Sequence, residues 1–158
     1  MDDLTTTHEM FVVERVYAAS PEQVFTWFSE TERKRKWFVD DPREDILSYQ
    51  LDFRVGGIEQ TRWKWAGGGP IPEGTVMGND TVYLDIVPGN RIVLAYSMLM
   101  GERRFSSSLL TFEFIGEGSQ TRLKATEQGA YFEGGDNAEM RKNGWGSLLD
   151  ALAGVIGA

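Results

Sequence analysis

The chain has 158 residues, of which 41% are hydrophobic and 25% are charged, as in an ordinary globular domain with one core. Sixteen basic against 24 acidic residues leave a net charge of -8, which argues against nucleic acid and anionic membrane surfaces as partners. The chain contains no cysteine, so disulfides, thiolate nucleophiles and cysteine-ligated metals are excluded. We expect one domain over residues 1–158, with about residues 1–8 frayed.

The N-terminal residues are acidic and polar, whereas a secretory signal needs positive charge followed by an apolar stretch. The longest apolar run, residues 92–100, has about nine residues, well short of the roughly 20 that span a bilayer. The absence of cysteine fits a reducing compartment. The sequence therefore predicts a cytoplasmic protein without a transmembrane segment.

The first elements are a strand and two short helices. Residues 9–17 are rich in Val and Phe and predict a strand. Ser20, Pro21 and Gln23 then form a capping box with proline at the first helical position, which predicts a helix to about Phe28. A second helix is predicted over about residues 30–37.

The second predicted helix carries a basic run over residues 33–36. Pairs of Glu30 with Lys34 and of Glu32 with Lys36 have the i,i+4 spacing of favourable ion pairs. We interpret the run as a solvated helix face. A site for an anionic partner is the alternative.

From residue 48 onward the pattern is that of β-structure with short turns, which predicts antiparallel neighbours and a meander. With the first strand, the sheet has about seven strands. The Gly-Pro-rich stretch 67–72 lacks the ending of a phosphate-binding loop, so we interpret it as a surface connection that could cover a cavity mouth. The further strands are expected over residues 49–54, 58–65, 81–87, 91–99, 104–115 and 120–128.

One long amphipathic helix is predicted over residues 137–156, capped by Asp136 with Glu139 in the first turn. Gly144 and Gly146 disfavour a helix interior, which indicates that the backbone closely approaches a pocket or a strand there. A helix across a curved antiparallel sheet leaves a cavity on the concave side, where small ligands bind. The predicted class is therefore α+β.

The chain carries a series of motifs at residues 14–15, 18–25, 37–38, 53–57, 85–92, 126–129, 144–146 and 148–149. In this order they resemble the START-like helix-grip superfamily, also called SRPBCC or Bet v-like. They are most similar to the family named after the activator of the heat-shock protein 90 ATPase. The resemblance implies a curved sheet wrapped around the C-terminal helix, and a range of functions from ligand carriers to cyclase-like enzymes and co-chaperone domains.

Strand alternation turns Leu123, Ala125 and Glu127 toward the interior. Glu127 is expected to form an ion pair or hydrogen bonds with an inward arginine such as Arg62, and a general base with a raised pKa is the alternative. Whether Arg62 or Trp63 faces the cavity depends on a register that the sequence leaves open. The candidate cavity-lining residues are Tyr83, Tyr96, Met98, Ser108, Phe112, Glu127, Trp145 and Leu149.

His8 is the only histidine, so a histidine-based triad or metal cluster is not expected in the cavity, and no cofactor is predicted. The leading hypothesis is a protein that binds a small hydrophobic or aromatic molecule without transforming it. A cyclase or dehydratase acting on a polyketide-type substrate, with Glu127, Tyr83 or Tyr96 moving a proton, is one rival. Regulation of a heat-shock chaperone is the other, and a homodimer is compatible with either.

Overall fold

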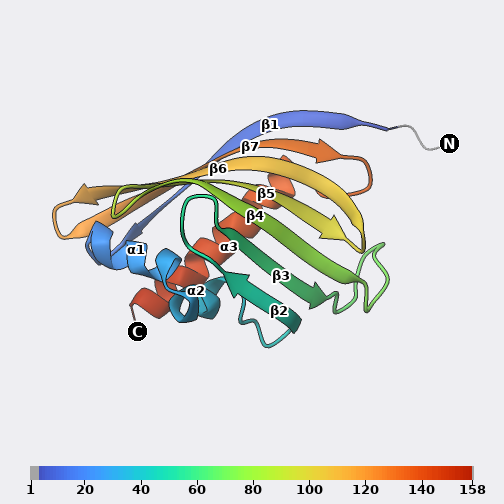
Figure 1. Ribbon diagram of the computed structural model, residues 1–158, viewed down its shortest axis with the longest axis horizontal. Helices are drawn as coiled ribbons and strands as arrows, with labels where there is room; N and C mark the ends of the chain where they lie inside the picture. Colours follow the sequence, from blue (N-terminus) through green and yellow to red (C-terminus); the bar gives the residue numbers. More distant parts are fainter. Residues whose placement is uncertain (1–3, 158) are drawn as a thin grey trace.

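A seven-stranded antiparallel sheet curves over one long helix in the computed structural model, which describes residues 4–157 (Figure 1). The strand order is β1-β7-β6-β5-β4-β3-β2, so β1 and β2 form the two edges. The elements are β1 Thr6–Tyr17, α1 Pro21–Ser29, α2 Thr31–Phe38, β2 Asp45–Leu51, β3 Ile58–Lys64, β4 Val76–Val87, β5 Arg91–Met100, β6 Arg103–Glu117, β7 Gln120–Phe132 and α3 Ala138–Ile156.

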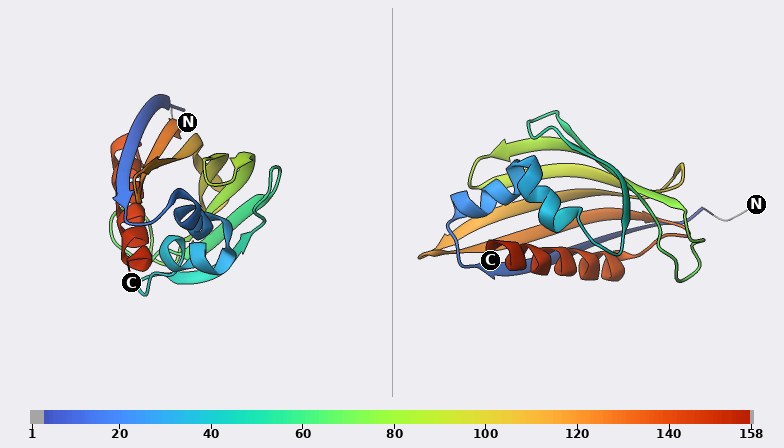
Figure 2. Two further views of the ribbon diagram at one scale, coloured as in Figure 1. Left: turned by 90° about the vertical axis from the view of Figure 1, so that its left-hand side faces the viewer. Right: turned by 90° about the horizontal axis from the view of Figure 1, so that it is seen from below.

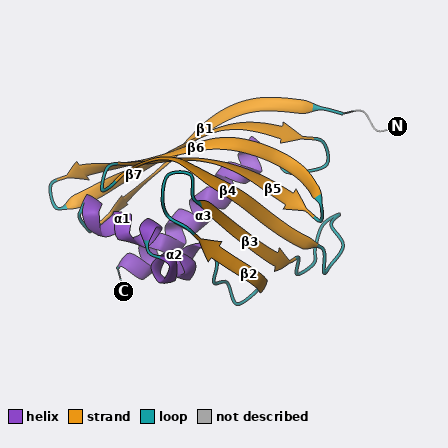
Figure 3. Ribbon diagram, viewed as in Figure 1, coloured by secondary structure: helices purple, strands orange, loops and turns teal. Residues whose placement is uncertain are grey.

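All three helices lie on the concave side of the sheet (Figures 2 and 3). The predicted α+β helix-grip architecture is confirmed: seven antiparallel strands, two short helices after the first strand, and a long C-terminal helix. Within the described residues, no helix is long and apolar enough to cross a membrane.

Several strands are longer than the sequence predicts. β1 begins at Thr6, which pairs with Phe132 of β7, so His8 lies within the sheet rather than in a frayed end. Residues 1–3, which were also expected to be frayed, lie outside the described residues. β4 begins at Val76 instead of residue 81, although Gly78 and Asn79 favour turns. Pairing with β3 and β5 on both sides overrides this local preference.

The start of α1 follows its local sequence. Ser20 Oγ accepts from the Gln23 backbone N–H at 3.2 Å, and Gln23 Oε1 accepts from the Ser20 N–H at 3.0 Å, so the predicted capping box is present. The predicted cap of α3 is wrong. Asn137 caps that helix by accepting from the Met140 N–H at 2.9 Å, and Asp136 instead binds Arg141.

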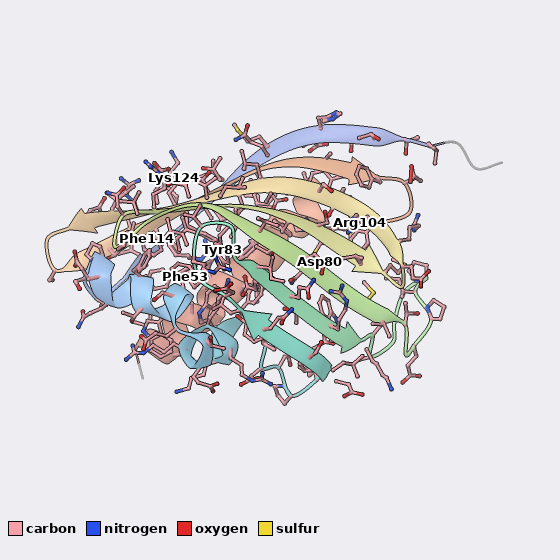
Figure 4. The ribbon with its side chains drawn as sticks, in the orientation of Figure 1. Phe53, Asp80, Tyr83, Arg104, Phe114 and Lys124 are labelled. Atoms are coloured by element: carbon pink, nitrogen blue, oxygen red, sulfur yellow. The ribbon has the colours of Figure 1, made fainter. Side chains whose placement is uncertain are left out.

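An aromatic core fills the end of the molecule where α1 covers the sheet. The Phe28 ring lies 5.0 Å from Phe112 and 5.2 Å from Phe114, between centroids. Phe53 and Tyr83, on the loop after β2 and on β4, lie beside each other with centroids 5.1 Å apart, while Lys124 lies on the outer side of the sheet (Figure 4). The space that these side chains leave unfilled lies toward α2 and strands β3, β4 and β5.

The stretch over residues 66–75 is the surface connection that the sequence predicts. Trp65 Nε1 donates to the Gly68 carbonyl at 3.0 Å, and the Trp65 backbone N–H donates to the Thr75 carbonyl at 2.8 Å. Gly67, Gly68 and Gly69 all have positive φ, a conformation that other residues rarely adopt.

Candidate functional site

A cavity of about 710 Å³ lies between the concave face of the sheet and helices α2 and α3. This volume falls within the range of pockets that hold small molecules. Strands β3, β4 and β5 supply most of one wall, with Ile46 from β2 and Leu110 from β6, and the two helices supply the other. Residues 39–44, between α2 and β2, also line the cavity.

Aromatic rings dominate the cavity wall. Four of the five tryptophans line it, together with Phe38. The Phe38 ring stacks on Trp145 at 6.1 Å between centroids with 25° between the planes. Flat apolar faces of this kind hold a ligand through buried area and ring stacking. The four tryptophans are Trp37, Trp63, Trp65 and Trp145.

The register of β3 answers the question that the sequence left open. Thr61 and Trp63 line the cavity, and Arg62 points to the outer face. There the Arg62 guanidinium lies 2.9 Å from the Asp80 carboxylate and passes over Gly78, where a Cβ atom would lie 2.6 Å from it. The expectation that Arg62 pairs with Glu127 is therefore wrong.

Arg141 of α3 is the partner that Glu127 has instead. Glu127 is fully buried, and its carboxylate accepts from Ser108 at 3.1 Å, from Tyr131 at 2.6 Å, and from the Tyr96 hydroxyl. Arg141 NH1 lies 3.5 Å from the same carboxylate. The prediction that Glu127 faces inward and is held by hydrogen bonds and an arginine is confirmed, with a different arginine.

Protein groups surround the Arg141 guanidinium. Nε and NH2 donate to the Asp136 carboxylate at 2.9 and 2.8 Å, and NH2 also donates to Ser106 at 2.8 Å. NH1 donates to the Tyr96 hydroxyl at 3.0 Å and faces Glu127. Four of the five N–H donors of the guanidinium therefore have a hydrogen-bond partner, and the fifth, on NH1, has only the ion-pair contact with Glu127.

Protein groups also occupy the hydrogen-bonding positions of the Tyr96 hydroxyl. It accepts from Arg141 NH1 at 3.0 Å and from Trp145 Nε1 at 3.1 Å, and it donates to Glu127. A hydroxyl has one donor and two acceptor positions, so none is left for a ligand. Burial also raises the pKa of Tyr96 above its ordinary range, against the opposing effect of Arg141. The network therefore positions the Tyr96 ring and offers no proton to the cavity.

A second buried ion pair joins α2 to the sheet. Lys34 Nζ donates to Glu59 Oε1 at 2.7 Å and to the Tyr83 hydroxyl at 3.2 Å. The Tyr49 hydroxyl donates to Glu59 Oε2 at 2.7 Å. Lys34 is only 3% exposed, so the interpretation of residues 33–36 as a wholly solvated face is wrong at this position. Its expected partner Glu30 instead pairs with Arg33 at 3.2 Å.

Among the described residues, three that line the cavity carry a buried polar atom without a hydrogen-bond partner. Thr61 Oγ1 and Asn79 Oδ1 are buried without a hydrogen bond, and both residues line the cavity. The two residues are directly opposite each other in the pairing of β3 with β4. Glu44 Oε2 at the rim is also unpaired, on a side chain that is only partly buried, and burial raises the pKa of this carboxyl group.

Of the eight predicted lining residues, Tyr96, Met98 and Trp145 line the cavity. The other five are core residues behind its wall. Strand alternation predicts that a side chain points to the concave face, but it does not predict whether that part of the face is packed with other side chains or lines the cavity. Those five are Tyr83, Ser108, Phe112, Glu127 and Leu149.

Sequence reasoning missed Arg141, Lys34 and Asn79 as residues of the wall. Arg141 had a detectable signal, because it precedes Trp145 by four residues and so lies in the apolar stripe of the helix. Within residues 4–157, no group of three or more His, Asp or Glu side chains is arranged to hold a metal ion.

The glycines of α3 meet different surroundings. A Cβ atom at Gly146 would lie 3.0 Å from the Arg15 guanidinium of β1, as expected where a helix approaches a strand. At Gly144, which lines the cavity, a Cβ atom would meet nothing within 4 Å.

This fold and cavity define a helix-grip protein. The family model described as "Activator of Hsp90 ATPase homolog 1-like protein" matches residues 18–157, and the chain belongs to that family. No curated protein shows significant similarity to the chain.

Solved structures agree with this assignment. The chain is 41% identical to the Mll3558 protein from Rhizobium loti, with a TM-score of 0.83 over 95% of this chain and 98% of that one. It is 34% identical to an uncharacterised protein from Rhizobium leguminosarum, with a TM-score of 0.87 over 98% of both chains. DynU16, a protein of the dynemicin biosynthetic locus, shares the fold at 16% identity, with a TM-score of 0.62 over 91% of this chain and 45% of its own.

Proposed function

We propose that the protein binds a small hydrophobic or aromatic molecule in the cavity and does not transform it. The observation that carries this proposal is the cavity of about 710 Å³ walled by four tryptophans. A solvent-filled space of this size between apolar rings is unfavourable, and a ligand that covers the rings removes their contact with water.

The polar groups around the cavity also favour binding over catalysis. The Tyr96 hydroxyl has all its hydrogen-bonding positions occupied by protein groups. Arg141 has four hydrogen bonds to protein groups and an ion-pair contact with Glu127, which lies behind the wall. Glu59 borders the cavity, but both of its oxygens accept from protein donors. A general acid or base must reach the proton that it transfers, and these groups are held by one another.

The two rivals keep specific support. A cyclase-like enzyme is compatible with the fold shared with DynU16, which is a protein of a biosynthetic locus. Chaperone regulation is suggested by the description of the family. A pull-down that recovers a heat-shock chaperone would favour the second rival over ligand binding. The cysteine-free composition leads us to propose the cytoplasm as the location.

The test is a thermal-shift screen of the protein against flat aromatics, polyketides, fatty acids and sterols. A ligand at about 100 times its Kd adds roughly 2.7 kcal/mol, which raises the Tm by about 5 to 10 °C in a domain of this size. Conversion of the bound compound into a product would favour the enzyme instead. The absence of a saturable shift across all four classes would overturn the proposal.

A matched pair of variants locates the binding site. Gly144 and Gly154 are both exposed positions of α3 where an added Cβ atom meets nothing within 4 Å, but only Gly144 lines the cavity. Gly144→Leu places a side chain at the opening, whereas Gly154→Leu makes the same chemical change outside it. We expect Gly144→Leu alone to weaken binding. Equal effects of the two variants would place the ligand elsewhere.

A further inference from the structure

Thr61 and Asn79 are the two strand residues of the cavity wall that carry unpaired buried polar atoms. Thr61 is 4% exposed and Asn79 is 8% exposed, and neither Thr61 Oγ1 nor Asn79 Oδ1 has a hydrogen-bond partner. Buried polar groups in proteins nearly always have a partner, and one without a partner destabilises the fold. The free protein therefore carries a cost. Both atoms are covered in the free protein, so each side chain must rotate before a ligand in the cavity can reach it and remove that cost.

The sheet places these two residues opposite each other. Thr61 and Asn79 are directly opposite in the antiparallel pairing of β3 and β4, where facing Cβ atoms are about 4.5 to 5.5 Å apart. Both side chains line the cavity. Trp63 lies two residues along β3 on the same wall, so a ring lying against Trp63 has its edge near the Thr61 and Asn79 pair.

The pair offers both kinds of hydrogen bond. A threonine hydroxyl donates or accepts, and the asparagine amide contributes a carbonyl oxygen and an NH₂ group. Adjacent donor and acceptor atoms on one edge of a ligand, as in a lactam or a primary carboxamide, would satisfy both residues together.

The buried charges of the wall already have protein partners, and its other charged residues lie in its more exposed part: Lys36, Asp40, Asp41, Arg43 and Glu44. Arg141 lies against the two carboxylates of Asp136 and Glu127, and Lys34 pairs with Glu59. These buried charges are held at short range by protein partners, so they do not demand a charged group from the ligand.

We infer that the cavity takes a neutral, planar aromatic molecule with a hydrogen-bond donor next to an acceptor, whose polar edge docks on Thr61 and Asn79. This inference rests on the proposed function and specifies its ligand class. Ring area against the tryptophans supplies the attraction, and the polar pair sets the orientation and rejects molecules without that edge.

The probes are phenanthridin-6(5H)-one, its N-methyl derivative and phenanthrene, titrated by quenching of tryptophan fluorescence. The three have similar flat rings, but only the first has a lactam N–H beside its carbonyl. We expect the lactam to bind roughly 10- to 100-fold more tightly than the other two, because they leave a polar atom of the wall unpaired.

The variants Thr61→Val and Asn79→Leu keep the shape of the side chains and remove the polar atoms. Each should bring the affinity for the lactam close to that for phenanthrene. Each should also raise the Tm of the free protein, because an unpaired buried polar atom is gone. Thr111→Val, on the outer-facing side of β6, is the control and should leave all three affinities unchanged.

The outcomes separate the inference from the proposed function. Equal affinity for the three probes, or an unchanged preference in the variants, would overturn the inference and leave cavity binding intact. A lower Tm in both variants would show a structural role and would also overturn it. If none of the three probes binds while another class in the thermal-shift screen does, the inference fails alone. If no compound binds at all, both proposals fail.

Discussion

Arg141→Met tests whether the buried network around Glu127 stabilises the fold. Arg141 is 6% exposed and Glu127 is fully buried, so the variant leaves a carboxylate in the interior without its counter-charge. Removing one member of a buried ion pair costs about 3 to 5 kcal/mol. For a chain of this length, that cost lowers the Tm by about 6 to 20 °C. Asp136 is partly exposed, so the loss of its contact with Arg141 adds less.

The measurement is urea unfolding followed by tryptophan fluorescence and circular dichroism. The double variant with Glu127→Gln removes the unpaired charge, and its cost should fall below the sum of the two single costs by about 0.5 to 3 kcal/mol. Arg122→Met is the control, because Arg122 pairs with Glu14 and Glu117 on the surface and its loss should change stability little.

Two results would refute this reasoning. A cost for Arg141→Met below about 1 kcal/mol would match an exposed ion pair and would mean that the network contributes little. Strict additivity of Arg141→Met and Glu127→Gln would mean that the two side chains do not interact energetically.

Three further predictions follow from the structure. Lys34→Met should lower the free energy of unfolding in urea by about 3 to 5 kcal/mol, because Glu59 loses its buried partner. Lys36→Met, on the exposed side of α2, should change it by less than about 0.5 kcal/mol. Similar costs for the two variants would contradict the difference in burial. Gly144→Ala and Gly154→Ala should each stabilise the protein by up to about 1 kcal/mol, because both positions have space for a methyl group, and a loss of stability would reveal an unseen contact. Burial raises the pKa of every tyrosine above its ordinary value near 10. These groups should therefore leave stability unaffected below about pH 10. Above that pH the stability should fall, because the unfolded chain loses protons that the folded chain keeps. Each tyrosine contributes up to about 1.4 kcal/mol per pH unit, and phenolate absorbance should appear together with unfolding; titration near pH 10 with intact circular dichroism would contradict this. The tyrosines are Tyr17, Tyr49, Tyr83, Tyr96 and Tyr131.

Local chemistry explains what was predictable from the sequence. The capping box at Ser20 and Gln23 depends on residues three positions apart, and it is present as predicted. The alternation that turned Leu123, Ala125 and Glu127 inward depends only on the two-residue repeat of a strand, and all three are fully buried. The order of the elements and the class of the fold follow from such local signals together with the family motifs.

Local chemistry was insufficient where two candidates were adjacent. Asp136 and Asn137 are both good helix caps, and the structure uses Asn137 because Asp136 is held by Arg141. The strand β4 contains residues that favour turns, and its pairing with two neighbours extends it to Val76.

The sequence by itself determined the number and order of the elements, the helix-grip class and the inward orientation of Glu127. Only the tertiary structure decided that Arg141 is its partner, that Lys34 leaves the solvated face to reach Glu59 at 2.7 Å, and that Thr61 stands unpaired opposite Asn79. The physical reason is that helices and strands form from neighbours along the chain, whereas a cavity wall forms from side chains that meet only when separate elements pack together.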